Sequence, residues 1–297
     1  MTFRTGVVCV IGRPNVGKST LVNQLVGEKV SIITPKPQTT RHRIRGIVNT
    51  EQAQLVLVDT PGLCAPGSAL HKAMRRLTTQ SMHDVDANLV VVTAQQTLHP
   101  ADAEVLQMAK APLIVAVNKI DRLGRKEEVL PLLQYLGETY NPVAIVPICA
   151  LRGDGVDVLR QELLARLPPG EPLFPADLYT DQAERVLCAE IVREKALYRL
   201  QQEVPHCLAV VIETFEDDRR EDGGLCRLEG VIVVERESQR GIVVGKGGAA
   251  IKQISQAARY DIEALLGCQV YLRLRVLVKQ DWTHKPHTVR EYGIAAE

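Results

Sequence analysis

Aromatic residues are scarce in this chain, making up 4% of its 297 residues with a single tryptophan. Its cores must therefore consist mainly of aliphatic side chains. Long apolar runs are also missing, because stretches such as Leu113–Val117 and Val231–Val234 are far shorter than the roughly 18 residues of a membrane-spanning helix. No signal peptide is visible. We expect a chain that neither spans a membrane nor is exported.

Cysteine spacing of the kind that marks disulfide frameworks or zinc sites is absent as well. The seven cysteines are scattered and odd in number, without a CxxC pair, which favours free thiols in a reducing cytoplasm. The net charge is only +1, which excludes a polycationic tail. Locally, residues 171–237 carry a net charge of −8 and residues 238–297 carry +4, so nucleic acid would favour the last segment.

The composition is typical of a soluble globular protein, with 45% hydrophobic and 24% charged residues. The length predicts about two domains. Four prolines and a glycine within Leu167–Pro175 cannot sustain a helix or a strand and mark the boundary. We therefore predict a first domain at 1–170, a linker at 171–180 and a second domain at 181–297.

The first domain alternates short apolar runs with stretches of helical spacing. The runs are rich in Val and Ile and apolar on both faces, as buried parallel strands are. Repeated strand–helix units predict an α/β fold with a doubly wound parallel sheet, in which ligands bind at the carboxyl ends of the strands. The predicted strands are Val7–Ile11, Gln54–Val58, Asn88–Thr93, Leu113–Val117 and Val143–Ile148, and helical stretches include Ala101–Ala109 and Val156–Leu167.

A phosphate-binding motif, GxxxxGK[ST], occupies Gly12–Ser19 between a predicted strand and a predicted helix. Its backbone N–H groups and the helix N-terminus suit a β-phosphate. Lys18 would reach the β- and γ-phosphates, and Ser19 would offer a hydroxyl to Mg²⁺. The alternative is a chance glycine-rich turn, which this setting disfavours.

Two further motifs follow strands of the same domain. Asp59–Gly62 (DTPG) would hold Mg²⁺ through a water and contact a γ-phosphate by the Gly62 N–H, although DxxG alone is a common turn. Asn118–Asp121 (NKID) suits guanine, since a carboxylate accepts from both N1–H and the exocyclic amine. Cys149–Leu151 follows the next strand, where a backbone N–H, mainly that of Ala150, would meet guanine O6.

The second domain carries a GxxG loop, Gly245–Gly248, ahead of a predicted helix. Such a backbone can approach a nucleic-acid backbone closely, Lys246 adds charge, and neighbouring Ile242 and Val243 would line a groove for unstacked bases. The alternative is a helix-initiating turn. Around the loop we predict, in order, a helix at 181–202, strands Cys207–Thr214 and Leu225–Val234, a helix at 248–266 and a strand at 270–278.

In this order and spacing the first-domain motifs resemble the small GTPase superfamily in its bacterial ribosome-assembly branch. Gln38–His42 (QTTRH) is similar to the first switch of that branch, which implies that Thr40 reaches Mg²⁺. The implied catalytic residues are Lys18, Thr40, Asp59 and Gly62, and the implied Mg²⁺ ligands are Ser19, Thr40 and Asp59. The implied GTP-binding residues are Gly12, Arg13, Pro14, Asn15, Val16, Gly17, Lys18, Ser19, Thr20, Asp59, Thr60, Pro61, Gly62, Leu63, Asn118, Lys119, Asp121, Cys149, Ala150 and Leu151.

The chain departs from the common GTPase pattern at two positions. Leu63 stands where many GTPases carry a water-orienting Gln, and Cys149 replaces the usual Ser. An aliphatic side chain cannot orient water, so we expect slow hydrolysis. Asn15 resembles the asparagine with which related GTPases hold K⁺ beside the phosphates, and the alternative is that Asn15 only shapes the loop.

The second domain resembles a prokaryotic-type KH domain, an α+β RNA-binding fold. A GTPase domain followed by one KH domain resembles a family of bacterial ribosome-assembly GTPases, which implies GTP hydrolysis, binding of 16S ribosomal RNA near its 3′ end and a role in 30S subunit assembly. That family also associates with the membrane periphery, which no feature of this sequence explains. We expect a cytoplasmic monomer. The implied RNA-binding residues are Ile242, Val243, Gly245, Lys246, Gly247, Gly248 and Lys252.

Two rival functions remain open from the sequence. One is an RNA-binding module with a purely structural nucleotide domain, which the intact Lys18, Ser19 and Asp59 disfavour. The other is a membrane-associated signalling GTPase without an RNA role, which the Gly245–Gly248 loop and the lack of a lipidation cysteine near either terminus disfavour.

Overall fold

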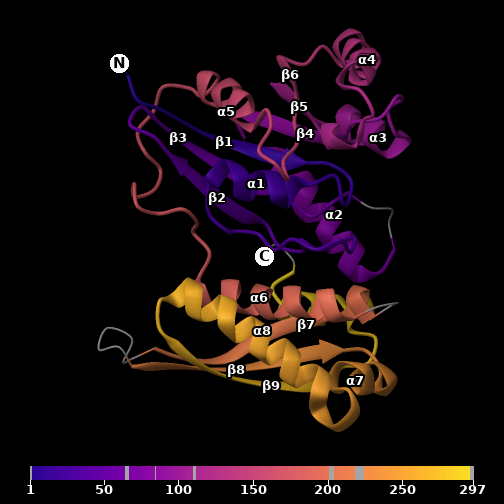
Figure 1. The fold of residues 1–297 in the computed structure, drawn as a ribbon, viewed down its shortest axis with the longest axis vertical. Coiled ribbons are helices and arrows are strands. Elements are labelled where there is room, and N and C mark those ends of the chain that lie inside the picture. The colour runs from indigo at the N-terminus through magenta and orange to yellow at the C-terminus, as the bar shows by residue number, and fades with distance from the viewer. Residues whose placement is uncertain are drawn as a thin grey trace. The chain divides into compact units, whose positions relative to one another are not determined.

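The computed structural model describes residues 2–63, 67–83, 85–109, 112–200, 204–217 and 224–294. The chain forms two compact units, each with its own hydrophobic core (Figure 1). Two short segments of the N-terminal half pack with the second unit. The first unit comprises Met1–Ile33, Thr40–Pro66 and Met74–Asp181, and the second comprises Thr34–Thr39, Gly67–Ala73 and Gln182–Glu297.

The first unit is built on a six-stranded sheet with the order β2-β3-β1-β4-β5-β6. The five predicted strands are confirmed, and all of them pair in parallel. The sixth, β2, was not predicted; it lies at the edge and pairs antiparallel with β3, so the sheet is mixed rather than wholly parallel. The strands are β1 (Arg4–Ile11), β2 (Ile44–Asn49), β3 (Ala53–Asp59), β4 (Ala87–Thr93), β5 (Leu113–Asn118) and β6 (Ala144–Pro147).

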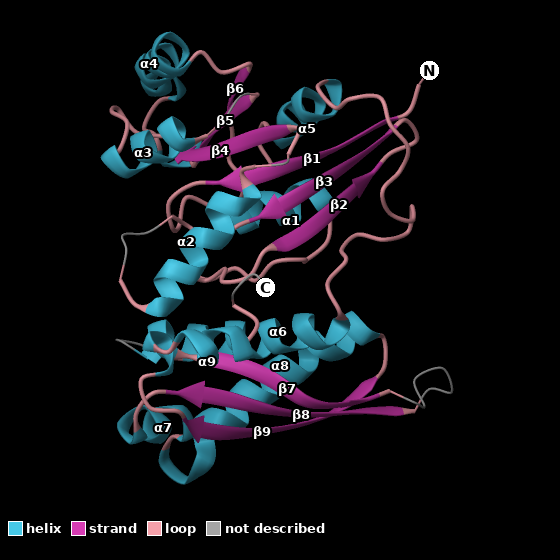
Figure 2. Cartoon of the chain, turned by 180° about the vertical axis from the view of Figure 1, so that it is seen from behind, coloured by secondary structure: helices cyan, strands magenta, loops and turns pink. Residues whose placement is uncertain are grey.

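Helices cover both faces of this sheet (Figure 2). Leu21 of α1 and Leu159 of α5 share one core with β1 and β3, whereas Val105 of α3 and Leu132 of α4 belong to the core on the opposite face. The helices are α1 (Lys18–Val26), α2 (Ala69–Ser81), α3 (Pro100–Met108), α4 (Leu130–Tyr140) and α5 (Val156–Ala165), with 3₁₀ turns η1 (Ile120–Arg122) and η2 (Lys126–Val129).

The parallel register brings the nucleotide motifs to one edge of the sheet. β1, β3 and β5 point the same way, and they end at Ile11, Asp59 and Asn118. Each motif begins at or just after one of these ends. The fold therefore gathers the three motifs at the carboxyl edge, where open α/β sheets bind ligands.

The proline-rich segment predicted as a linker packs on the first unit along β2 and β3. The buried Gln54 side chain accepts from the N–H of Leu173 (2.7 Å) and of Phe174 (2.9 Å) and donates to the Phe174 carbonyl (2.8 Å). Further along, the N–H of Ile47 donates to the Tyr179 carbonyl (2.9 Å). The Ile47 bond supplies a partner to the outer side of β2, the edge strand, where no neighbouring strand pairs with it.

The second unit contains a three-stranded sheet with the order β7-β8-β9, antiparallel between β7 and β8 and parallel between β8 and β9. Ile191 of α6 and Ile262 of α8 belong to one core with residues of all three strands. The elements are α6 (Glu184–Arg199), η3 (Val204–Cys207), β7 (Ala209–Glu216), β8 (Leu225–Val234), α7 (Glu237–Val244), η4 (Lys246–Gly248), α8 (Ala249–Leu266), β9 (Gln269–Val278), η5 (Trp282–His284) and α9 (Pro286–Glu291).

The predicted order of elements in the second unit is confirmed, and two α-helices, α7 and α9, are added to it. α7 was not predicted, because Gly241 lies inside it and Gly245 ends it, and glycine weakens the sequence signal of a helix. The end of the helix predicted at 181–202 falls partly outside the described residues, and α6 ends at Arg199. No helix in the described ranges is long and apolar enough to cross a membrane.

Candidate nucleotide site and RNA-binding loop

The loop between β1 and α1 is folded around the side chain of Lys18. Its Nζ donates to the carbonyls of Gly12 and Arg13, both at 3.1 Å. Burial lowers the pKa of Lys18 to about 8, although the nearby Asp59 carboxylate acts in the opposite direction. α1 begins at Lys18, so its first N–H groups point into the loop. A helix N-terminus and a buried amine at one point suit a polyphosphate.

The other residues of this loop divide into backbone and side-chain roles. The Arg13 guanidinium is directed away, donating to Asp102 and to Thr93, both at 3.0 Å. The Val16 side chain lies in the core, and Thr20 is half-buried in α1. Arg13 and Val16 can therefore contact a nucleotide only through their backbone atoms. Asn15 adopts a left-handed backbone (φ 64°), and its carbonyl accepts from Lys119 Nζ.

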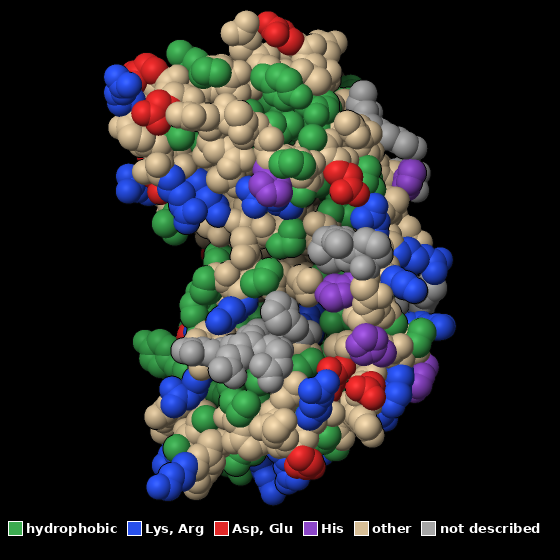
Figure 3. Space-filling view, turned by 90° about the vertical axis from the view of Figure 1, so that its right-hand side faces the viewer, with side chains coloured by type: hydrophobic (Ala, Val, Ile, Leu, Met, Phe, Trp, Pro, Cys, Tyr) green, Lys and Arg blue, Asp and Glu red, His purple; other side chains and the backbone are tan. Residues whose placement is uncertain are grey.

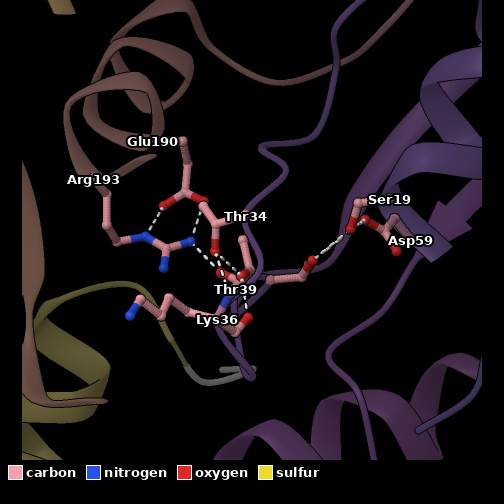
Figure 4. Close-up of polar contacts among 8 residues, drawn as sticks. Ser19, Thr34, Lys36, Thr39, Asp59, Glu190 and Arg193 are labelled. Atoms are coloured by element: carbon pink, nitrogen blue, oxygen red, sulfur yellow. Dashed lines mark hydrogen bonds and ion pairs between the residues drawn. The ribbon is translucent and has the colours of Figure 1, made fainter. Parts of the chain in front are cut away.

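Three oxygens predicted as magnesium ligands lie together. The Ser19 hydroxyl donates to Asp59 Oδ2 (2.7 Å), and Thr40 Oγ1 lies 2.8 Å from Ser19 Oγ and 3.5 Å from Asp59 Oδ2 (Figure 4). Burial raises the pKa of the Asp59 carboxyl. Its second oxygen, Oδ1, is buried and accepts no hydrogen bond from the described residues. Hydroxyl and carboxylate oxygens with an unsatisfied buried acceptor fit a hard cation such as Mg²⁺.

The Asp59–Gly62 turn lies against the phosphate loop. A Cβ on Gly62 would meet the Pro14 nitrogen at 2.7 Å, so only glycine permits this approach. The Leu63 N–H donates to the Gly12 carbonyl (3.2 Å), while its side chain is buried in the core. The Thr60 hydroxyl donates to the Val10 carbonyl (2.8 Å), and the Pro61 carbonyl accepts from a buried threonine of α2. The side chains of Thr60 and Leu63 thus hold the turn in place, and only the backbone groups of these residues are left to contact a nucleotide.

Asn118 joins the three segments that would surround a base. Its amide Nδ2 donates to the Val16 carbonyl (2.7 Å), and its Oδ1 accepts from the N–H groups of Lys119 (2.8 Å) and Ala150 (2.9 Å). The Ala150 N–H was predicted to meet guanine O6, but here it is used by Asn118. The N–H of Leu151 makes no backbone–backbone hydrogen bond within the described part of the chain and is directed at the Cys149 sulfur, so it is the next candidate to meet O6.

Asp121 stands beside the cysteine that replaces the usual serine. The Cys149 thiol donates to Asp121 Oδ1 at 3.0 Å, and this hydrogen bond lowers the pKa of the Asp121 carboxyl. Burial, together with Asp121, raises the pKa of the Cys149 thiol, which keeps it protonated as the donor. The substitution of Ser by Cys therefore preserves a donor to the carboxylate.

The Gly245–Gly248 loop connects α7 to α8 and presents its middle to solvent. A Cβ on Gly245 would meet Ala250 Cβ at 2.7 Å, so this glycine serves packing, whereas a Cβ on Gly247 would meet nothing within 4 Å. Lys246 and Gly247 are exposed, as is Lys252 on α8. The loop therefore has room on its outer side for a nucleic-acid backbone.

The two apolar residues proposed for RNA contact differ in exposure. Ile242 is 45% exposed on α7, but Val243 is fully buried in the core. In α7 successive side chains point about 100° apart, so one of the pair faces inward. The prediction that Val243 lines an open groove is wrong for this structure.

Lys and Arg side chains do not form a patch of one sign of charge on the face of the second unit that Figure 3 draws. On the face drawn in Figure 3, Lys and Arg side chains of the second unit, in the lower part of the view, are interspersed with Asp and Glu. The loop itself is recognisable by its backbone geometry and by Lys246.

One buried ion pair was missed by the sequence interpretation. Glu190 and Arg193 lie one turn apart on the buried face of α6, and Arg193 donates to the carbonyl of Thr39. The available signal was their i, i+3 spacing among apolar residues that include Leu187 and Ile191.

Two family models match the chain. The model described as "50S ribosome-binding GTPase" matches residues 7–119, and the model described as "KH domain" matches residues 203–283. The first match contains the phosphate loop, the DTPG turn and the first two residues of NKID. The second contains the Gly245–Gly248 loop.

Relatives match over nearly the whole chain. GTPase Era of Syntrophus aciditrophicus is 44% identical over 294 residues, covering 98% of this chain and 95% of that protein. GTPase Era of Mycolicibacterium smegmatis is 44% identical over 298 residues, covering 98% and 99%.

Two solved structures share the fold of both units. A variant of Aquifex aeolicus Era bound to GDP and AlF₄⁻ matches with a TM-score of 0.94 at 41% identity, covering 99% of this chain and 100% of that one. Era in complex with MgGDPNP and nucleotides 1506–1542 of 16S ribosomal RNA matches with a TM-score of 0.93 at 40% identity and the same coverage. The chain belongs to the Era family and is a GTPase.

Proposed function

We propose that this GTPase binds 16S ribosomal RNA near its 3′ end, assists assembly of the 30S subunit, and changes its RNA affinity with the bound nucleotide. The observation that carries this proposal is the exposed Gly245–Gly248 loop in the same chain as a complete nucleotide site. The 40% identical Era bound to 16S ribosomal RNA supports the choice of RNA.

The nucleotide site assigns a role to each motif. Lys18 and the N-terminus of α1 bind the β- and γ-phosphates, and the Gly62 N–H binds the γ-phosphate. Ser19, Thr40 and Asp59 hold Mg²⁺, with Asp59 acting through a water. The Mg²⁺ supplies charge neutralisation at the β- and γ-phosphate oxygens. The MgGDPNP complex of the Era relative supports this assignment.

The base pocket follows from the contacts around Asn118. Asp121 accepts from guanine N1–H and the exocyclic amine, and the Leu151 N–H meets O6. The Lys119 stem covers the base. Adenine lacks the donor pair that Asp121 requires, so binding it would leave the carboxylate unsatisfied.

Hydrolysis is slow, and potassium assists it. Leu63 is buried and aliphatic, so no side chain at that position orients the attacking water. Asn15 lies in the phosphate loop beside Lys119 and supplies a ligand for K⁺, which places positive charge where an arginine finger would act.

RNA contacts come from the outer side of the GxxG loop. Gly247 and Gly248 allow the RNA backbone to approach, and Lys246 and Lys252 pair with phosphates. Ile242 provides apolar contact for an unstacked base. Because its proposed RNA is part of the small subunit, the protein acts in the cytoplasm. It acts as a monomer, and any contact with the membrane is peripheral.

The rival without an RNA role is a membrane-associated signalling GTPase. Crosslinking RNA to the protein in cells, followed by sequencing, separates the two. We expect reads concentrated near the 3′ end of 16S RNA, and their loss with Lys246→Asp/Gly247→Asp. Reads spread without enrichment, or unchanged in that variant, would contradict the proposal. The rival with a purely structural nucleotide domain predicts no steady GTP turnover by the purified wild-type chain.

A further inference from the structure

Helix α6 buries a charged pair, Glu190 and Arg193, outside the apolar core that its residues Cys188, Ile191 and Val192 share with the sheet. Arg193 Nε donates to Glu190 Oε1 (2.7 Å) and Arg193 Nη2 to Glu190 Oε2 (2.6 Å). The side chains are only 3% and 8% exposed. Removing two charges from water costs several kcal/mol per ion, so such a pair adds little stability compared with apolar residues of similar volume.

The pair has a third member that is not on α6. Arg193 Nη2 also donates to the main-chain carbonyl of Thr39, in the segment Thr34–Thr39 that packs with the second unit (Figure 4). Its Nη1 is buried and makes no hydrogen bond with the described residues. The guanidinium thus bonds to the Thr39 carbonyl through Nη2 while its Nη1 donor stays buried without a hydrogen bond to the described residues.

The Thr34–Thr39 segment is itself a closed turn. Thr34 Oγ1 lies 2.7 Å from Thr39 Oγ1, which donates to the Lys36 carbonyl (2.7 Å). Gln38 Oε1 lies 3.1 Å from Nε2 of His71, which joins this turn to the start of α2. Because Thr39 is hydrogen-bonded to Thr34 and Lys36, a bond that holds the Thr39 carbonyl also restricts the rest of the turn.

The next residue along the chain is Thr40, whose hydroxyl lies 2.8 Å from Ser19 Oγ. Adjacent ligands of an octahedral Mg²⁺ with bonds of about 2.1 Å are about 3 Å apart. In this structure the two hydroxyls form a hydrogen bond, and the same separation would let both oxygens bind one Mg²⁺. The turn that Arg193 holds is the one that places Thr40 at the metal position.

We infer that Arg193, oriented by Glu190, is a positioning residue for the switch segment: its bond to Thr39 favours the arrangement with Thr40 at the metal, and so favours GTP over GDP. The inference rests on the nucleotide switch proposed above. Arg193 acts through the Thr39 carbonyl and touches neither the nucleotide nor the metal. Because γ-phosphate and Mg²⁺ hold the switch segment closed, any group that stabilises the closed form raises the relative affinity for the triphosphate.

The test replaces the pair by apolar residues, Glu190→Leu/Arg193→Met, because such replacements usually preserve folding. The matched control is Lys195→Met/Asp261→Leu, which removes another ion pair, between α6 and α8. The first measurement is the ratio of affinities for MgGDPNP and GDP. The second is hydrogen exchange of the amides at 34–40 with MgGDPNP bound.

We expect the affinity ratio to fall roughly tenfold in Glu190→Leu/Arg193→Met, as for loss of one charge-assisted hydrogen bond, with faster exchange at 34–40. Arg193→Lys keeps the charge but cannot donate to Glu190 and Thr39 at the same time as the planar guanidinium does. Its affinity ratio should lie between those of wild type and of the double variant. The control should match wild type. An unchanged ratio and unchanged protection in the folded pair variant would overturn the inference. Equal protection of 34–40 by MgGDPNP and GDP in wild type would instead contradict the switch itself.

Discussion

At the scale of single residues, the proposed base pocket depends on Asp121. Asp121→Asn replaces an acceptor for guanine N1–H by an amide that can donate to the extra carbonyl of xanthine. We expect GTP binding to weaken by about 2–4 kcal/mol, the scale of an unpaired charged hydrogen bond, while xanthosine triphosphate binding appears. Nucleotide titration of the purified variant measures both. Asp157→Asn, an exposed carboxylate of α5, is the control, and an unchanged preference for guanine in Asp121→Asn would mean that the base lies elsewhere.

Asn15 tests the potassium assignment through its backbone conformation. Because its φ is 64°, alanine is strained there and glycine is not. Both Asn15→Ala and Asn15→Gly remove the side-chain ligand, so we expect both to lose the rate difference between equimolar KCl and NaCl that wild type shows. If Asn15 only shapes the loop, Asn15→Gly will keep the wild-type behaviour. Equal wild-type rates in the two salts would also contradict the assignment.

Residue types with a fixed chemical partner were predictable from the sequence. Lys18, Ser19 and Asp59 follow from phosphate and metal chemistry at a known spacing, and the structure brings them together. Val243 was misjudged because α7 was not recognised, so its inward direction was unknown. Arg193 was missed because its partner, Thr39, lies 154 positions away in the sequence.

At the scale of elements, Gln54 holds the proline-rich segment against β2 and β3. Gln54→Ala would leave the N–H groups of Leu173 and Phe174 without their acceptor on β3. We expect the segment to lose about 2–4 kcal/mol of local stability, seen as faster hydrogen exchange at 173–174. Gln52→Ala, at an exposed position nearby, is the control. Exchange at 173–174 that stays at the wild-type rate in Gln54→Ala would show that other contacts hold the segment.

The GxxG loop allows a substitution that separates RNA binding from GTP binding. Lys246→Asp/Gly247→Asp places two negative charges against phosphates, so RNA binding should be lost. Folding should be preserved, because a Cβ on Gly247 meets nothing within 4 Å and aspartate tolerates its left-handed backbone better than most residues.

Filter binding of 16S 3′-end RNA and titration of GTP measure the two activities of this variant. The control, Gly124→Asp/Lys126→Asp, makes the same change of charge in an exposed loop of the first unit and should bind RNA nearly as wild type does. Undiminished RNA binding by the loop variant would refute the assignment of the Gly245–Gly248 loop.

Elements with a strong apolar pattern were predictable, and those that depend on neighbours were not. β5 was recognised at nearly its observed bounds because it is a continuous apolar run, and β8 because it ends in the apolar run Val231–Val234. β2 carries Arg45 and Gly46, so its apolar signal is weak, and its pairing with β3 stabilises it. The bonds between β2 and 178–179 could not be foreseen, since proline-rich sequence carries no signal for where it packs.

At the scale of the whole molecule, the central claim is that the binding of GTP and the binding of RNA by this chain affect each other. If the nucleotide changes RNA affinity by some factor, RNA must change nucleotide affinity by the same factor. Typical coupling of 1–3 kcal/mol corresponds to roughly 5- to 150-fold. The motifs of the two activities were predictable from the sequence, whereas a contact such as that of Arg193 with Thr39 joins residues 154 positions apart and is seen only in the structure.

Calorimetric titration of a 16S 3′-end RNA into the protein, once with MgGDPNP and once with GDP, tests this claim most directly. We predict tighter RNA binding with MgGDPNP by at least about fivefold, and the same factor when the nucleotides are titrated with RNA present. Identical RNA affinities in the two nucleotide states would contradict the account and leave two independent binding activities in one chain.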